Sequence, residues 1–172
     1  MTNIVRLGDW PAGTNRGGVI PDQPAVVVIE DSAQNASSIG RQLAKALEEQ
    51  GIENANVVLI YIQSGKGFQG VQELLRTISL DIRMILIDVA DDDEVKRARS
   101  AKRPLDARNR TLFPGIPLLR ALRRGFPRAS VMGLSRFSRE VMAEAIKDEY
   151  PVLYKPTLRS GIAPYLDALK LS

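Results

Sequence analysis

The sequence predicts an α/β fold built on a doubly wound, five-stranded parallel sheet. Short apolar runs alternate along the chain with segments of helical periodicity, and turn residues separate the two kinds of segment. Runs that are apolar at every position are typical of strands buried on both faces, as in parallel sheets covered by helices. The five expected strands span residues 25–30, 57–62, 84–88, 129–134 and 151–154.

Amphipathic stripes follow each of these strands. The first carries Ile39, Leu43 and Leu47 at four-residue steps, and Gly51 is a stop signal after it. The other stripes lie within residues 71–78, 118–122, 141–146 and 162–169, and Pro164 is expected in the first turn of the last helix. We expect the strand order 2-1-3-4-5, because it brings the ends of the first and third strands side by side.

Composition narrows the chemistry that the chain can perform. The 172 residues are enough for one domain with a full core. The chain has no cysteine and no histidine, which excludes disulfides, thiol nucleophiles, imidazole bases and zinc sites of the usual kind. A metal site in this chain therefore needs oxygen ligands, which favours Mg²⁺.

Two segments fall outside the regular alternation. Residues 1–24 are rich in proline and glycine and are expected to form an irregular N-terminal arm before a domain at 25–172. Residues 91–114 form a long insertion after the third strand, with a short helix expected around 94–102. No run approaches the roughly 20 apolar residues of a membrane span, and no apolar signal core is present, so a cytoplasmic location is expected.

Polar side chains end four of the five expected strands. Glu30 and Asp31 follow the first, Asp88 ends the third, Ser135 follows the fourth, and Lys155 follows the fifth. Each alone has an ordinary explanation as a helix cap, turn residue or surface charge. Together they favour one site at the carboxyl edge of the sheet, suited to a divalent cation and a phosphoryl group. With the cation bound, Asp88 could act as a carboxylate nucleophile on phosphorus.

These strand ends also resemble a known family, the receiver domain of two-component response regulators, which has a flavodoxin-like fold. The matching segments are Val26-Val27-Val28-Ile29-Glu30-Asp31, Met84-Ile85-Leu86-Ile87-Asp88, Leu134-Ser135 and Tyr154-Lys155-Pro156. Ser64-Gly65 and Gly115 fit the family's pattern as well. The resemblance covers roughly residues 25 to 172.

The resemblance implies a role for each site residue. Glu30, Asp31, Asp88 and the backbone carbonyl of Ala90 would hold Mg²⁺, and Asp88 would accept the phosphoryl group. Ser135 would donate a hydrogen bond to it, Lys155 would pair with its charge, and the peptide bond before Pro156 would be cis. A histidine kinase or histidine phosphotransfer protein would supply the phosphoryl group, and a downstream protein would bind the last two helices. Turnover would be limited to phosphorylation and dephosphorylation of the domain's own aspartate.

Three positions differ from the family's pattern. Val152 stands where the family usually has Tyr or Phe, Arg136 stands where it has a small residue, and residues 91–94 are acidic. The alternative interpretation is a pseudo-receiver, an interaction module that acts without phosphorylation. A third interpretation is a phosphatase or phosphotransferase that uses Asp88 on an external substrate.

The insertion becomes strongly basic after residue 95. Between Lys96 and Arg110 it carries seven cations and a single acid, Asp106. One interpretation is a solvated surface segment; the other is docking to an acidic partner or to nucleic acid phosphate. Because no aromatic residue is interleaved, base stacking is not supported, and we expect no nucleic acid partner.

Overall fold

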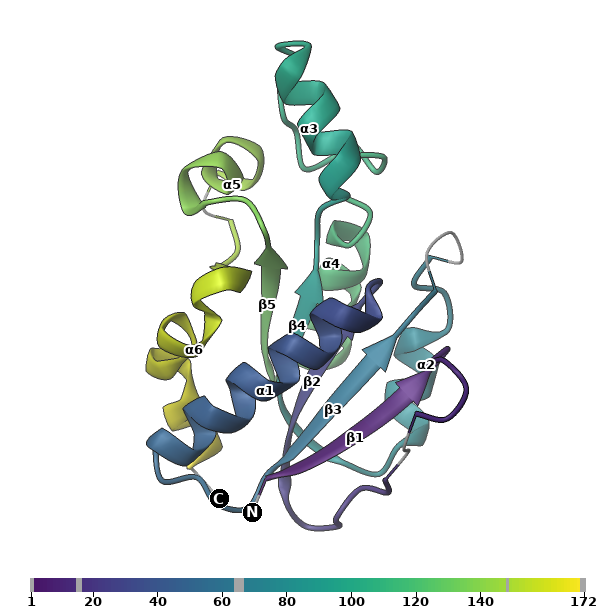
Figure 1. Cartoon of the computed structure of the whole chain (residues 1–172), viewed down its shortest axis with the longest axis vertical. Helices are drawn as coiled ribbons and strands as arrows, with labels where there is room; N and C mark the ends of the chain where they lie inside the picture. Colours follow the sequence, from purple (N-terminus) through teal and green to yellow (C-terminus); the bar gives the residue numbers. More distant parts are fainter. Residues whose placement is uncertain (1, 15–16, 64–66, 148, 171–172) are drawn as a thin grey trace.

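The protein is built around a parallel sheet of six strands, seen in the computed structural model of residues 2–14, 17–63, 67–147 and 149–170 (Figure 1). The strands are β1 (Asn3–Gly8), β2 (Pro24–Glu30), β3 (Asn56–Tyr61), β4 (Asp81–Asp88), β5 (Ser130–Ser135) and β6 (Val152–Tyr154). Their spatial order is β1-β3-β2-β4-β5-β6, and all five pairings are parallel.

The expectation of five strands in the order 2-1-3-4-5 is wrong for the sheet as a whole. Residues 3–8, expected to belong to an irregular arm, form the edge strand β1 and pair with β3, from Asn3 opposite Asn56 to Gly8 opposite Tyr61. Only Val5 of this strand is fully buried. The sequence of β1 therefore does not need the continuous apolar run that is typical of a central strand, and it has none. The other strands lie in the order β3-β2-β4-β5-β6.

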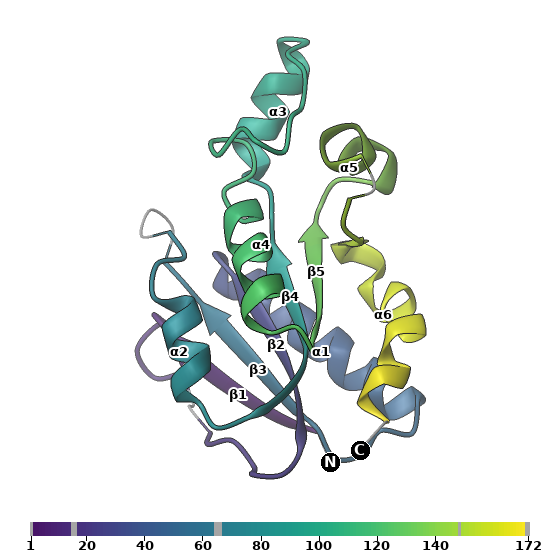
Figure 2. The same ribbon diagram turned by 180° about the vertical axis from the view of Figure 1, so that it is seen from behind.

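Helices cover both faces of the sheet (Figures 1 and 2). One face packs against α1 (Ala33–Glu49), α6 (Leu158–Gly161) and the 3₁₀ helix η2 (Ala163–Leu169). The other packs against α2 (Val71–Thr77), α4 (Ile116–Gly125) and α5 (Arg139–Ile146). Alternate residues of β2 belong to the two cores, with Val27 and Ile29 on one side and Val26 and Val28 on the other. This two-sided burial is the reason that the strand sequence is apolar throughout.

Local signals explain where α1 begins and how closely it packs. The Ser32 side chain accepts a hydrogen bond from the backbone N–H of Asn35, which satisfies one of the unpaired donors of the first turn. Ile39, Leu43 and Leu47 are buried against the sheet. Gly40 lies so close to β3 that a Cβ there would be 2.9 Å from Leu59 Cδ1.

The C-terminal helix differs from the single stripe expected over residues 162–169. The chain instead forms α6, which ends at Gly161, and then η2, which begins at Ala163. Pro164 lies in the first turn of η2, as expected, and its missing N–H prevents the α-helical hydrogen bond that would have continued α6. Ile162 and Leu166 are still buried against the sheet. None of the helices among the described residues is long and apolar enough to cross a bilayer.

The N-terminal segment is fastened to the sheet by one buried side chain, Asn56. Its Oδ1 accepts hydrogen bonds from Asn3 Nδ2 at 3.0 Å and from the backbone N–H of Ile20 at 2.9 Å. Its Nδ2 donates to the backbone oxygens of Ile20 at 2.8 Å and of Gln23 at 3.4 Å. Asn56 itself is completely buried, so its amide depends on these partners for its hydrogen bonds. The amide therefore joins β3, β1 and the chain that leads into β2.

Replacing Asn56 by Ala is expected to lower the free energy of unfolding by about 2–3 kcal/mol, because polar backbone groups of Ile20 and Gln23 lose their partner. The measurement is urea unfolding followed by circular dichroism. Asn3→Ala is the control, since it leaves every bond from Asn56 to the backbone in place and is expected to cost about 1 kcal/mol. Equal losses in the two variants would contradict the role given to Asn56.

Candidate functional site

The polar strand-end residues are distributed along one edge of the sheet. Glu30 is the last residue of β2, Asp88 of β4 and Ser135 of β5, and Asp31 follows β2 directly. Lys155 follows β6 and begins the short 3₁₀ helix η1 (Lys155–Thr157). Because all the strands are parallel, their carboxyl ends lie at the same edge, the upper edge of the sheet in Figure 1.

The centre of this site is an ion pair shared by three buried side chains. The Lys155 ammonium lies 2.9 Å from Glu30 Oε2 and 3.1 Å from Asp88 Oδ1. Glu30 has no exposed surface, and Asp88 and Lys155 are each 6% exposed. Charges so far from water interact strongly, and each is costly to leave without a partner. The two carboxylates therefore depend on one ammonium.

This shared pairing sets the direction of each pKa shift. Burial raises the pKa of Asp88 well above its usual value, the Glu30 carboxylate raises it further, and Lys155 opposes both effects. Burial also raises the pKa of Glu30, again against the influence of Lys155. Burial alone would lower the pKa of Lys155, but Asp88 and Glu30 outweigh it, so that this pKa is raised and the ammonium keeps its proton.

The same carboxylates form a group that could hold a cation. One oxygen each from Glu30, Asp31 and Asp88 lies within 4.8 Å of the others. Asp31 is exposed and opens the group to solvent, while Glu30 Oε1 receives no hydrogen bond from the described residues. Three carboxylates against one ammonium leave an excess of negative charge, and all the ligand atoms are hard oxygens. The group could therefore hold a hard divalent cation.

Backbone packing fixes the position of Asp88 and of the loop after it. Gly115 lies directly against this loop, because a Cβ at Gly115 would be 2.1 Å from the Asp88 carbonyl oxygen and 2.8 Å from Val89 Cα. The Gly115 N–H donates to the carbonyl of Val89 at 3.3 Å. Only glycine fits here without displacing the backbone of β4. Ala90, whose carbonyl is a predicted metal ligand, is buried in the same loop.

Ser135 and Arg136 lie where β5 ends. The Ser135 hydroxyl oxygen is buried and accepts a hydrogen bond from the backbone N–H of Phe137 at 2.9 Å, which leaves its proton available for donation. The Arg136 guanidinium is exposed and donates to Asn35 Oδ1 at 3.3 Å. Arg136 thus connects the end of β5 to the first turns of α1.

The acidic run after Asp88 has a structural role that the sequence interpretation missed. Asp91 caps helix α3 (Asp92–Ser100), accepting a hydrogen bond from the backbone N–H of Glu94 at 3.1 Å. Three further acids lie in the first turn of this helix, where the helix dipole favours negative charge. Partial burial raises the pKa of Asp92, against the opposing charges of Lys155 and Arg136, so Asp92 belongs to the surroundings of the site. The sequence signal for the cap was Asp91 followed three residues later by Glu94.

The family resemblance also implied a cis bond before Pro156 and a match at Ser64-Gly65. No cis peptide bond occurs among the described residues, so the bond between Lys155 and Pro156 is trans and the expectation of a cis proline is wrong. Ser64-Gly65 lies outside the described residues.

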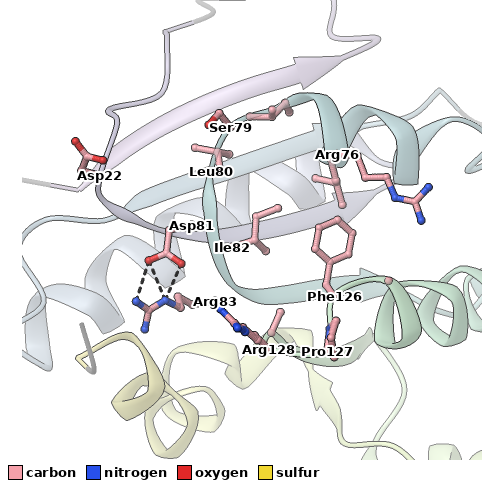
Figure 3. Close-up of a pocket in the computed structure, with 14 residues that line it drawn as sticks. Asp22, Arg76, Ser79, Leu80, Asp81, Ile82, Arg83, Phe126, Pro127 and Arg128 are labelled. Atoms are coloured by element: carbon pink, nitrogen blue, oxygen red, sulfur yellow. Dashed lines mark hydrogen bonds and ion pairs between the residues drawn. The ribbon is translucent and has the colours of Figure 1, made fainter.

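Pockets lie at both ends of the strands. One, of about 640 Å³, borders the site and is lined by residues that include Asp31, Asp91 and Arg110. Another, of about 870 Å³, lies at the opposite end of β4 (Figure 3). This pocket is separate from the strand-end site, because Asp81 in its lining is the first residue of β4 whereas Asp88 is the last.

No family model matches the chain, and the searches of curated proteins and of solved structures gave no significant match.

The shared ion pair predicts opposite effects for two substitutions. Lys155→Met leaves two buried carboxylates without a counter-charge and is expected to lower the free energy of unfolding at pH 7.5 by about 3 kcal/mol. Asp88→Asn removes one of the two competing carboxylates and is expected to leave the protein at least as stable as the native chain. Thermal or urea unfolding measures both. A similar loss in the two variants would contradict the shared pairing.

The loss in Lys155→Met is also expected to depend on pH. The pKa values of Asp88 and Glu30 are raised in the folded protein, so these groups take up protons on acidification before the unfolded chain does. The difference in stability between this variant and the native protein should therefore shrink as the pH falls from 7.5 toward 5. A constant difference over this range would show that the loss comes from packing instead.

Proposed function

We propose that this chain is a receiver domain of two-component signalling, which accepts a phosphoryl group on Asp88 with Mg²⁺ and thereby regulates partner binding. The observation that carries the proposal is the Lys155 ammonium within 3.1 Å of both Glu30 and Asp88, in a site where Asp31 completes the carboxylate group. This site would combine an acidic nucleophile with a charge partner for phosphate and with ligands for a hard cation.

The arrangement of the sheet supports this proposal. The order β3-β2-β4-β5-β6 places the ends of β2 and β4 side by side, and the chain passes to opposite faces of the sheet after these two strands. A ligand site is expected where the strand order reverses in this way. We therefore assign the fold to the flavodoxin-like, receiver type, with β1 as an additional edge strand.

The residues would divide the phosphoryl transfer among them. An oxygen of the Asp88 carboxylate attacks phosphorus, and the bond between phosphorus and the donor's leaving group breaks. Glu30, Asp31, Asp88 and the Ala90 carbonyl would hold Mg²⁺, which would supply positive charge near the phosphoryl oxygens. Lys155 would turn part of its pairing from Asp88 to a phosphoryl oxygen, and the Ser135 hydroxyl would donate to another.

The phosphoryl group must come from outside this chain, which has no histidine. A histidine kinase, a histidine phosphotransfer protein or a small phosphodonor would supply it. Movement of Ser135 and the adjoining loop toward the new anion would change the surface formed by α5, α6 and η2, where we expect a downstream protein to bind. A cytoplasmic location, and no turnover beyond the domain's own aspartyl phosphate, belong to the same proposal.

A second candidate function is the pseudo-receiver that acts without phosphorylation. Asp88 is only 6% exposed, Lys155 already satisfies part of its charge, and Val152 occupies the position of the family's aromatic residue. A protein of this kind would bind its partner equally well with and without Mg²⁺ and phosphate mimics. Asp88→Asn would leave that binding unchanged.

Incubation with acetyl phosphate and Mg²⁺ is expected to add the mass of one phosphoryl group to the native chain and none to Asp88→Asn. Beryllofluoride with Mg²⁺ should shift the amide signals of residues near Asp88, Ser135 and Lys155 in NMR spectra. Asp93→Asn is the matched control, because this exposed acid lies in the first turn of α3 outside the carboxylate group and should behave like the native protein. Failure of the native chain to respond to either reagent would reject the receiver and favour the pseudo-receiver.

A further inference from the structure

The insertion forms a projecting arm beyond the strand ends (Figures 1 and 2). We define the basic arm as residues 92–112, which comprise α3 and the chain that returns from it, and its tip as residues 96–103. Helix α3 begins near the end of β4 and extends away from the sheet, so its C-terminal end and the tip lie farthest from the body of the protein.

The basic arm is folded and attached to the domain. Val95 and Ala98 of α3 are completely buried, and Leu105, Ala107 and Leu112 of the returning chain are buried in the same hydrophobic cluster. The Ala107 N–H donates to the carbonyl of Ala145 in α5 at 3.2 Å. The insertion is therefore folded onto the domain through the buried side of α3, and the tip remains exposed to solvent.

Charge is divided along the basic arm. Its acids are concentrated in the first turn of α3, close to the strand ends. Arg97 pairs with Glu94 and Arg108 with Asp106, so these two cations are neutralised locally. Four exposed cations at the tip form no ion pair with any acid of the described residues: Lys96, Arg99, Lys102 and Arg103.

Lys102 occupies a backbone position that favours glycine. Its φ is +52°, and around it the Arg103 N–H donates to the Ala98 carbonyl at 2.8 Å, the bond that characterises a Schellman motif. A lysine in this left-handed conformation costs the fold stability that glycine would not cost. Its side chain is exposed and makes no ion pair with the described residues, so folding does not explain the choice of residue.

The exposed chemistry of the basic arm indicates what it contacts. The large hydrophobic residues exposed among the described residues are Ile20, Tyr154 and Tyr165, and none lies on the arm. A protein partner would therefore find no apolar or aromatic anchor, which stable protein interfaces usually have at their centre. Clustered Lys and Arg without aromatic residues suit the phosphates of a duplex, whose bases are already stacked.

We propose that the tip of the basic arm binds the phosphate backbone of double-stranded DNA without reading its sequence. This reverses the expectation of no nucleic acid partner, which depended on the absence of aromatics and thus concerned base stacking alone. The binding does not require the phosphorylation of Asp88, so it stands or falls separately from the receiver function.

The test is fluorescence anisotropy with a labelled DNA duplex of mixed sequence at low salt. The native chain is expected to bind, and a variant with Lys96, Arg99, Lys102 and Arg103 all changed to Gln is expected to bind at least about tenfold more weakly. The dependence of log K on log salt should flatten by roughly one for each cation removed. The matched control changes four other exposed cations that have no ion pair among the described residues, Arg41, Lys45, Arg124 and Arg128, to Gln. Equal weakening in both variants, or no binding by the native chain, would overturn the proposal.

The variant Lys102→Gly is expected to change DNA binding and stability in opposite directions. Glycine should raise the melting temperature because it relieves the left-handed strain, yet it should weaken DNA binding because it removes a cation. Unchanged DNA binding in this variant would remove Lys102 from the contact.

Asp88→Asn should bind DNA as the native chain does. Displacement of the DNA by poly-L-glutamate at equal charge concentration would overturn the preference for phosphate and indicate an acidic protein partner instead.

Discussion

Two buried carboxylates that share one buried ammonium are the constraint on which the rest of the site depends. Glu30, Asp88 and Lys155 come from three strand ends that are far apart in sequence, and the charges are tolerable only while these ends stay together. The parallel sheet meets this requirement, because β2 and β4 are adjacent and β6 follows β5 at the same edge. The fold and the electrostatics of the site therefore depend on each other.

Much of the fold was predictable because strands buried on both faces are apolar at every position of the sequence. Strands β2, β4 and β5 are apolar because they contact helices on both faces, and each of them ends in a polar residue of the candidate site. The grouping of Glu30, Asp31 and Asp88 followed from this reasoning. Edge strand β1 has no such continuous apolar run, since Arg6 and other half-exposed residues interrupt it. The number of strands was accordingly wrong.

Other features depend on tertiary contacts that periodicity does not contain. The sharing of Lys155 between two acids requires particular distances between strand ends, and the trans bond before Pro156 departs from what family resemblance implied. In the sequence, the acidic run after Asp88 was only a departure from the family's pattern, yet it caps α3 and forms its first turn. Here the missed information was local, because Asp91 and Glu94 have the spacing of a helix start.

The pairing of β1 with β3 has a consequence for the solubility of shortened chains. Without residues 3–8, β3 would present an unpaired row of backbone donors and acceptors beside the apolar residues Val57, Val58, Leu59 and Ile60. Such an open edge can recruit strands from other copies and promote aggregation. In the intact chain the half-polar β1 blocks this edge, which gives the least apolar strand of the sheet a protective role.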